Sequence, residues 1–156
     1  MSDNKKLSPS ILLNIILFGF MGQVAWAVEN QFFNVYLTSV GGNMHDITVM
    51  IGVSAIVAFL TTLFMGSFSD KINKRKIFIC AGYILWGLTV IAFAFLNPDY
   101  ISKLLNASPE APVVISTTVT LIIIMDAIMT FMGSTSNDAA FNAWITDIGT
   151  SSNRSK

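Results

Sequence analysis

Cysteine and charge are both scarce in this chain. Its single cysteine, Cys80, excludes a disulfide framework and any redox mechanism that needs two thiols. Only 12% of the residues are charged, about half the fraction of a typical soluble domain, whereas 53% are apolar. The formal net charge is zero, and the few basic residues follow the membrane pattern described below. No nucleic-acid partner is therefore expected.

Charge is absent altogether from two long stretches. Residues Ile47–Ser69 and Ile77–Leu96 contain no Asp, Glu, Lys or Arg, and each is as long as the roughly 20 apolar residues that cross a bilayer. The basic start at Lys5 and Lys6 is followed by an apolar segment that is too long for a cleavable signal peptide and lacks a clear cleavage site. The chain is therefore expected to be an integral membrane protein.

Four transmembrane helices account for the apolar segments, so the predicted fold is all-α. Loops are expected at Gly41–Asn43, Asp70–Lys76 and Asn97–Pro112. With four spans, every Lys and Arg except Lys103 lies on one side, which the positive-inside rule assigns to the cytoplasm. The protein is then expected in the plasma membrane. Both termini lie in the cytoplasm, and His45 faces outward. The predicted spans are residues 11–37, 47–69, 77–96 and 113–148, and the cytoplasmic bases are Lys5, Lys6, Lys71, Lys74, Arg75, Lys76, Arg154 and Lys156.

The fourth apolar segment is longer than one bilayer crossing, and two placements are open. As one continuous helix it would be about 51 Å long, against a hydrocarbon core of ~30 Å. In one placement the span ends at Gly133, and Asp138 lies in a loop. In the other the span runs from about Met125 to Asp147, its upstream part projects outward or is tilted, and Asp138 lies near mid-membrane. We favour the second, because neither a proline nor a charge cluster breaks the chain after Gly133.

The first predicted helix carries a stripe of amide side chains. Gln23, Asn30 and Asn34 lie within about 20° of one another at 100° per residue, and Glu29 is one step round the helix. One interpretation is that these amides hydrogen-bond neighbouring helices. We favour the other, the wall of a substrate cavity, because three amides and a carboxylate exceed what helix association needs.

Asp138 is the main candidate on the fourth helix. A carboxyl group inside the membrane can hold a proton or accept hydrogen bonds from substrate, or it can pair with a buried base from another helix. We expect it to face the bundle interior beside the Gln23, Asn30 and Asn34 stripe. At α-helical spacing the fourth helix has two polar stripes, one of Asp126, Gly133 and Asn137 and the other of Ser134, Asp138 and Asn142.

The loop between the second and third spans is patterned as well as basic. Gly66 is followed by Asp70 and Lys71, and then by the basic run 74–76. This pattern resembles the loop between helices 2 and 3 of the major facilitator superfamily, G-x-x-x-D-[RK]-x-G-x-[RK]-[RK]. The difference is Asn73, where that family usually has Gly. Asn tolerates the left-handed backbone conformation better than most residues, so the change is mild.

Asp147 ends the fourth predicted helix on the same side of the membrane as this loop. We expect it to pair with Lys71 or Arg75, and we expect Asp70, Arg75 and Asp147 to form a charge cluster that latches one conformation. The alternative is a solvated charge at a helix end, which contributes little.

The resemblance implies the fold and function of a major facilitator superfamily transporter. Such transporters have twelve helices in two six-helix halves, with a small solute bound between the halves near the midplane. Residues 1–156 would form the N-terminal part of the first half. The expectation is therefore a secondary active transporter, not an enzyme, present here as a fragment whose partner helices follow further along the chain.

Within the superfamily, residues 135–144 resemble the fourth helix of the glycoside–pentoside–hexuronide cation symporters. In that family an Asp and a Phe three residues later contribute to the sugar site, which implies roles for Asp138 and Phe141. The first-helix Asp of that site falls near Gln23, which has no charge. Trp144 can stack on a sugar ring, although tryptophan in membrane proteins more often packs at the interface.

The same resemblance bears on the coupling ion. The two second-helix carboxylates of that family align with Ala58 and Thr62, so its sodium site is absent. A proton, carried by Asp138 or Glu29, is then the expected coupling ion. Asp126 is a second departure, because many superfamily members have an Arg there.

Two other classes of protein compete with the transporter fragment. One is a complete four-helix membrane protein, either a small dimeric exporter or a non-transporting scaffold. Small exporters of this kind are shorter and lack a long basic loop. The other class, an intramembrane enzyme, needs a metal cluster or nucleophile pair within the spans, whereas the sole histidine, His45, lies in the outer loop. Neither a metal nor a cofactor is expected.

Overall fold

The computed structural model describes residues 7–149, and all regular structure in that part of the chain is helical. Four helices are long and apolar enough to cross a membrane, which confirms the predicted fold class and span count. The fourth is continuous from Pro112 to Ile148 and consists of a π-helical segment between two α-helical segments. The helices are α1 (Pro9–Ser39), α2 (Met44–Ile72), α3 (Arg75–Phe93), the short α4 (Pro98–Leu105), α5 (Pro112–Gly133), the π-helix η1 (Ser134–Phe141) and α6 (Asn142–Ile148).

Polar residues at the helix ends fix where the long helices begin and end. The Asn43 side chain accepts hydrogen bonds from the first turn of α2, and Asp46 returns one to the Asn43 backbone, which forms a capping box. At the other end of α2, Asn73 adopts the left-handed conformation, with φ 55° and ψ 34°. This confirms that Asn can occupy the position where the resembling loop usually has Gly.

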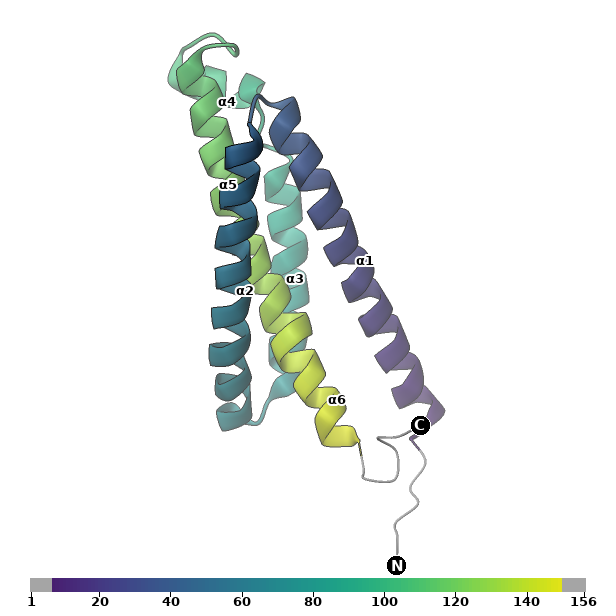
Figure 1. Ribbon diagram of the computed structural model, residues 1–156. Helices are drawn as coiled ribbons and strands as arrows, with labels where there is room; N and C mark the ends of the chain where they lie inside the picture. Colours follow the sequence, from purple (N-terminus) through teal and green to yellow (C-terminus); the bar gives the residue numbers. More distant parts are fainter. Residues whose placement is uncertain (1–6, 150–156) are drawn as a thin grey trace, which may run out of the picture.

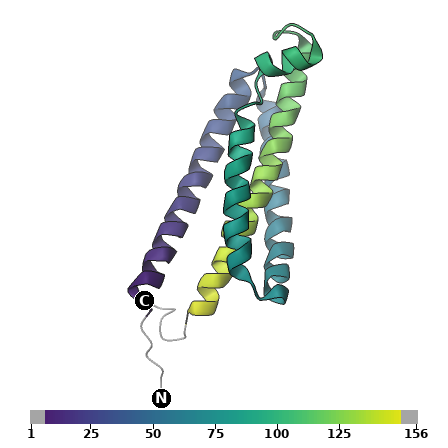
Figure 2. The same cartoon turned by 180° about the vertical axis from the view of Figure 1, so that it is seen from behind.

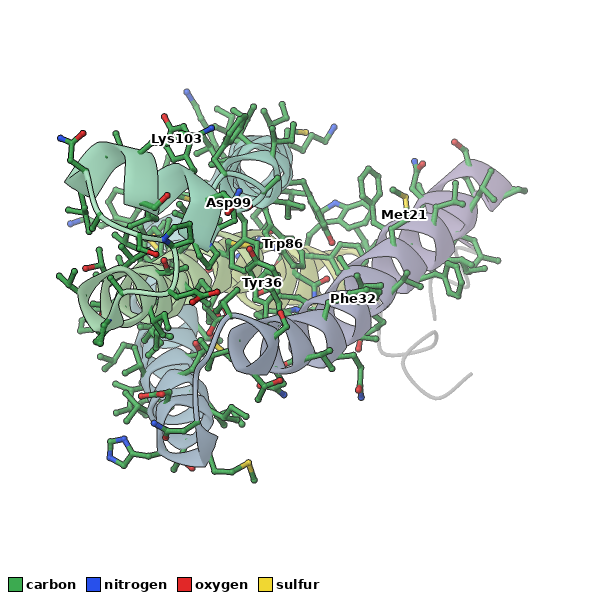
Figure 3. All side chains as sticks on the ribbon, turned by 90° about the horizontal axis from the view of Figure 1, so that it is seen from above. Met21, Phe32, Tyr36, Trp86, Asp99 and Lys103 are labelled. Atoms are coloured by element: carbon green, nitrogen blue, oxygen red, sulfur yellow. The ribbon has the colours of Figure 1, made fainter. Side chains whose placement is uncertain are left out.

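The helices form one elongated bundle with the fourth span at its centre. Figures 1 and 2 show α5, η1 and α6 crossing the bundle obliquely, and this span packs extensively against both α2 and α3. In its most apolar stretch 39% of the residues are buried, against 6% in α1. Seen from above, α1 leans away from the other helices (Figure 3). Most of the α1 surface is therefore left to lipid or to further protein.

The two ends of the bundle differ in composition. The start of α1, the α2–α3 connection and the end of α6 lie at one end, and α4 lies at the other (Figure 1). We call these the basic end and the α4 end, because Lys71, Lys74, Arg75 and Lys76 lie at or beside the α2–α3 connection.

Small residues let the fourth span approach its neighbours closely. A Cβ added to Gly82 on α3 would lie 2.6 Å from Ser136 Cβ, and one added to Gly22 on α1 would lie 2.4 Å from Asn137 Oδ1. Close backbone approach through small residues is a common basis of helix association in membranes, where burial away from water supplies little driving force. These contacts fix the depth of η1 relative to α1 and α3.

Two sequence expectations need correction. The segment 97–112, expected to be a loop, contains α4, because the Asn97 side chain caps a helix whose first residue is Pro98. Of the two alternatives for the fourth segment upstream of Met125, the outward projection is wrong, since Val114, Thr118 and Ile122 are fully buried, and the tilt matches the oblique course of the span in Figures 1 and 2. Asp138 lies on the helix rather than in a loop.

Candidate functional site

A cavity lined by both polar and apolar side chains, called the polar cavity below, lies between α1, α2 and α5. Its volume is about 230 Å³. Two carboxyl groups from different helices, Glu29 and Asp126, line it together. The remaining lining residues are Trp26, Asn30, Phe33, Asn34, Met50, Ile51, Ser54, Ala55, Ala58 and Thr130.

Glu29 on α1 is held by a hydrogen-bond partner on α3. Its Oε2 accepts a 2.8 Å hydrogen bond from Trp86 Nε1 on α3. The side chain is only 6% exposed, and Oε1 has no hydrogen-bond partner within residues 7–149. Figure 3 shows Trp86 between α3 and α1. Glu29 also lines a more apolar groove of about 450 Å³ between these two helices.

Asp126 on α5 is the second buried carboxyl group, 7% exposed. Its Oδ2 accepts a hydrogen bond from the Ser54 hydroxyl on α2. Sequence reasoning placed Asp126 on a polar stripe but left it out of the candidate site. An ionisable residue inside a span was the signal that could have included it. Ser54 and Trp86 gave no comparable signal, since single serines and tryptophans are ordinary in membrane helices.

The amide stripe of α1 is only partly in this cavity. Asn30 and Asn34 line it, and each amide nitrogen donates to the α1 carbonyl four residues earlier, at 2.8 Å and 2.9 Å. Each amide oxygen is thereby left as the acceptor at the end of its side chain. Gln23 is exposed and lines none of the described cavities.

Asp138 belongs to a different place on the bundle. It lines a groove along α2 together with Thr62, Gly66 and Asp70, closer to the basic end than the Glu29–Asp126 cavity. No α1 residue lines this groove, so the structure does not bring Asp138 beside the Gln23, Asn30 and Asn34 stripe. The two places are adjacent rather than remote, because Ala58 lines both.

Asn137 connects Asp138 to α3. Its amide nitrogen donates to Asp138 Oδ1 at 3.1 Å, and its oxygen accepts from the Tyr83 hydroxyl at 3.0 Å. Asn137 is 4% exposed and packs against Gly22 of α1. Tyr83 was not predicted, and nothing in its sequence context singled it out. The arrangement orients the Asp138 carboxyl group from the protein side.

The π-helix changes which residues share a face. A π-helix closes i→i+5 hydrogen bonds in place of i→i+4 bonds, so side chains four apart no longer line up. Ser134 is fully buried, Asp138 is half-buried and Asn142 is exposed. The predicted stripe of these three residues is therefore wrong. π-helical turns occur frequently at functional sites, and this one contains Asp138.

The two aromatic candidates of the fourth span lie outside the polar cavity. Phe141 is 4% exposed, packs with Ile79 and Ala140, and contacts Gly19 on α1. Trp144 is half-buried, lies 6.0 Å from Phe141 between ring centroids, and lines a groove at the basic end. Neither ring lines a groove with Asp138.

The predicted charge cluster at the basic end is present. Arg75 forms ion pairs with both Asp70 and Asp147, and its Nη2 donates to Asp147 Oδ1 at 3.2 Å. A further bond of 3.3 Å goes from Arg75 Nη1 to Ser69, which sequence reasoning missed. Among the described residues Lys71 forms no ion pair, so Arg75 is the partner of Asp147. Lys76 is exposed and lines the adjoining groove with Trp144.

One comparison with known proteins identifies a relationship. The model of the MFS_1 like family matches residues 11–154, which is nearly the whole chain. Neither the curated proteins nor the solved structures include a match to this chain. Within the described residues no group of three or more His, Cys, Asp or Glu side chains is arranged to hold a metal ion.

Proposed function

This chain belongs to the MFS_1 like family, whose members are membrane transporters, and on that basis we propose that it serves secondary active transport of a small solute across the cell membrane. The observation that carries the proposal is the cavity between α1, α2 and α5. Two buried carboxyl groups, Glu29 and Asp126, line it together with amide, hydroxyl and apolar side chains. A buried ionisable group is costly in a membrane and by default marks a substrate or ion pathway.

The proposed coupling ion is the proton. Glu29 and Asp138 are the proposed carriers, since each is a carboxyl group that lines a cavity or groove within a span. A carboxyl group can take up a proton where no basic side chain neutralises it. In the cation symporters that this chain resembles, two α2 carboxylates form the sodium site. The corresponding residues here are Ala58 and Thr62, and neither has a carboxylate to bind sodium.

The Arg75 cluster is the proposed conformational latch. It joins the end of α2, the start of α3 and the end of α6 at one end of the bundle. Alternating access requires such contacts to form in one state and break in another. The exposed carboxylates of the cluster fit a contact that can be broken, because exposed ion pairs contribute only about 0–1 kcal/mol each.

The rest of the transporter and the class of solute are further parts of the proposal. Additional helices would cover α1 and close the cavity, as in the twelve-helix transporters that the chain resembles. The resemblance of residues 135–144 implies a sugar bound by Asp138 and Phe141. Phe141 is packed against other side chains and is therefore not free to contact a sugar in this conformation. Sugars are accordingly included in the transport test as one class of solute among others.

Transport by proteoliposomes tests the proposal. The transporter encoded by the complete gene is reconstituted, and uptake of labelled sugars and labelled amines is measured with and without an inward proton gradient. We expect uptake that depends on the gradient, and we expect Asp138→Asn or Glu29→Gln to abolish the gradient dependence. The variant Asp99→Asn, on the exposed face of α4, serves as the control. Absence of any gradient-driven uptake would reject secondary transport.

A further inference from the structure

The polar groups of the Glu29–Asp126 cavity are mostly hydrogen-bond acceptors, and this property indicates what it binds. Glu29 and Asp126 supply carboxyl oxygens, and Asn30 and Asn34 supply amide oxygens, because their nitrogens bond to the α1 backbone. The Ser54 hydroxyl already donates its hydrogen bond to Asp126. The cavity therefore presents mostly hydrogen-bond acceptors.

The carboxyl groups in the cavity have no basic counterpart among the described residues. The Lys and Arg residues within 7–149 lie at the two ends of the bundle, and none lines this cavity. His45, at the α4 end, is not a lining residue either. Glu29 Oε1 is buried without a hydrogen-bond partner among the described residues. A buried acceptor without a partner costs about 1–3 kcal/mol, so an occupant that donates to it is favoured.

The ligands available fit an ammonium group better than a metal ion. A hard metal cation takes six or more oxygen ligands, whereas Glu29 Oε2 and Asp126 Oδ2 are already engaged by Trp86 and Ser54. A primary ammonium needs only three acceptors. The ring of Trp26 also lines the cavity, and indole faces attract organic cations.

From these observations we infer that this cavity is a binding site for a small organic cation with a primary ammonium group. The ammonium is held by Glu29 and Asp126, and its hydrocarbon part lies against Trp26, Phe33 and Met50. At about 30 Å³ per water-sized group, the cavity has room for about seven or eight such groups. The inference rests on the proposed function and names an amine, in place of a neutral sugar, as the solute that this cavity takes.

Equilibrium binding to the chain in lipid nanodiscs tests the inference. Labelled cyclohexylammonium is the probe, and cyclohexanol and glucose are uncharged references, the first matched to the probe in shape. We expect the ammonium to bind and the references not to. Glu29→Gln and Asp126→Asn should each weaken binding at least about tenfold, because each removes a buried charge from the site. Asp99→Asn removes an equal charge from the exposed surface and should bind like the parent.

A second measurement needs no variant and so does not depend on whether the variants fold. A hydrophobic carbodiimide modifies carboxyl groups in membranes, and mass spectrometry locates the modified residues. We expect cyclohexylammonium, but not cyclohexanol, to protect Glu29 and Asp126. Equal binding of ammonium and alcohol, no binding of the ammonium, or carboxyl modification that is the same with and without it would each overturn the inference. Binding with no gradient-driven transport would instead reject the transport function and leave this site standing.

Discussion

Trp86 on α3 donates a 2.8 Å hydrogen bond to Glu29 on α1, and both side chains are buried. This bond crosses the apolar groove between the two helices, where α1 otherwise leans away from the bundle. It therefore ties a loosely packed helix to the core and fixes one oxygen of the carboxyl group. The other oxygen, Oε1, is buried without a hydrogen-bond partner among the described residues.

The first prediction concerns this bond. Trp86→Phe keeps an aromatic ring but removes the donor, which leaves the buried Glu29 carboxyl group without its partner. We expect a loss of about 1–3 kcal/mol of stability, measured as a lower thermal unfolding midpoint in nanodiscs. Trp144→Phe is the matched control, because Trp144 is half-buried at the basic end. Equal midpoints for the two variants would show that the Trp86–Glu29 bond contributes nothing.

The second prediction concerns the close approach of α3 and η1. Gly82→Ala places a methyl group 2.6 Å from Ser136 Cβ, so the helices must separate. Overpacking of this kind typically costs about 1–3 kcal/mol. Gly87→Ala on the same helix meets nothing within 4 Å and should be neutral or slightly stabilising, since Ala favours a helix. Thermal unfolding of both variants decides whether this contact limits how closely the helices pack.

The third prediction concerns the latch. Arg75→Ala removes both ion pairs, yet the two carboxylate side chains are 60% and 53% exposed. We therefore expect less than about 1 kcal/mol change in stability per pair but a marked loss of transport. Lys76→Ala, the adjacent exposed base, should leave both properties unchanged. If Arg75→Ala transports normally, the basic run is a topological signal alone.

The fourth prediction concerns orientation. In a background with Cys80 replaced by Ala, single cysteines are placed at Ser2, His45 and Lys103. An impermeant thiol reagent added to intact cells should label positions 45 and 103 and spare position 2, because the basic end is expected in the cytoplasm. Labelling of position 2 without position 45 would reverse the topology. Of these three sites, position 2 lies outside the described residues, as do the bases at 5, 6, 154 and 156.

The parts of the fold that depend on local composition were predictable. The length of the apolar segments predicted the four spans, and a single Asn with access to the left-handed region predicted the end of α2. The ion pairs of Arg75 followed from opposite charges at helix ends on one face.

The pairing of side chains across helices was not predictable in the same way. Which hydroxyl faces Asp126, or which indole faces Glu29, depends on the rotation and depth of two helices, and no local pattern encodes these. The prediction of which side chains share a face of the fourth span was wrong for a different reason. The stripes were drawn at 100° per residue, and η1 does not have that winding. Asp138 was expected beside α1 because a carboxyl group in the membrane needs a polar cavity, whereas it lines a groove along α2.

The winding of η1 couples the middle of the fourth span to its end by torsion. The side chains of α6, which follows Phe141, point in directions that depend on how many residues the π-helical turns contain. If the segment changed to α-helical winding with a register shift of one residue, α6 would rotate by about 100° around its axis. Asp147 would then turn away from Arg75, and the ion pair would open although neither charge had changed. A rearrangement around Asp138 can in this way reach the basic end of the bundle mainly as a rotation of the helix, with a shift of only about 1.5 Å along its axis.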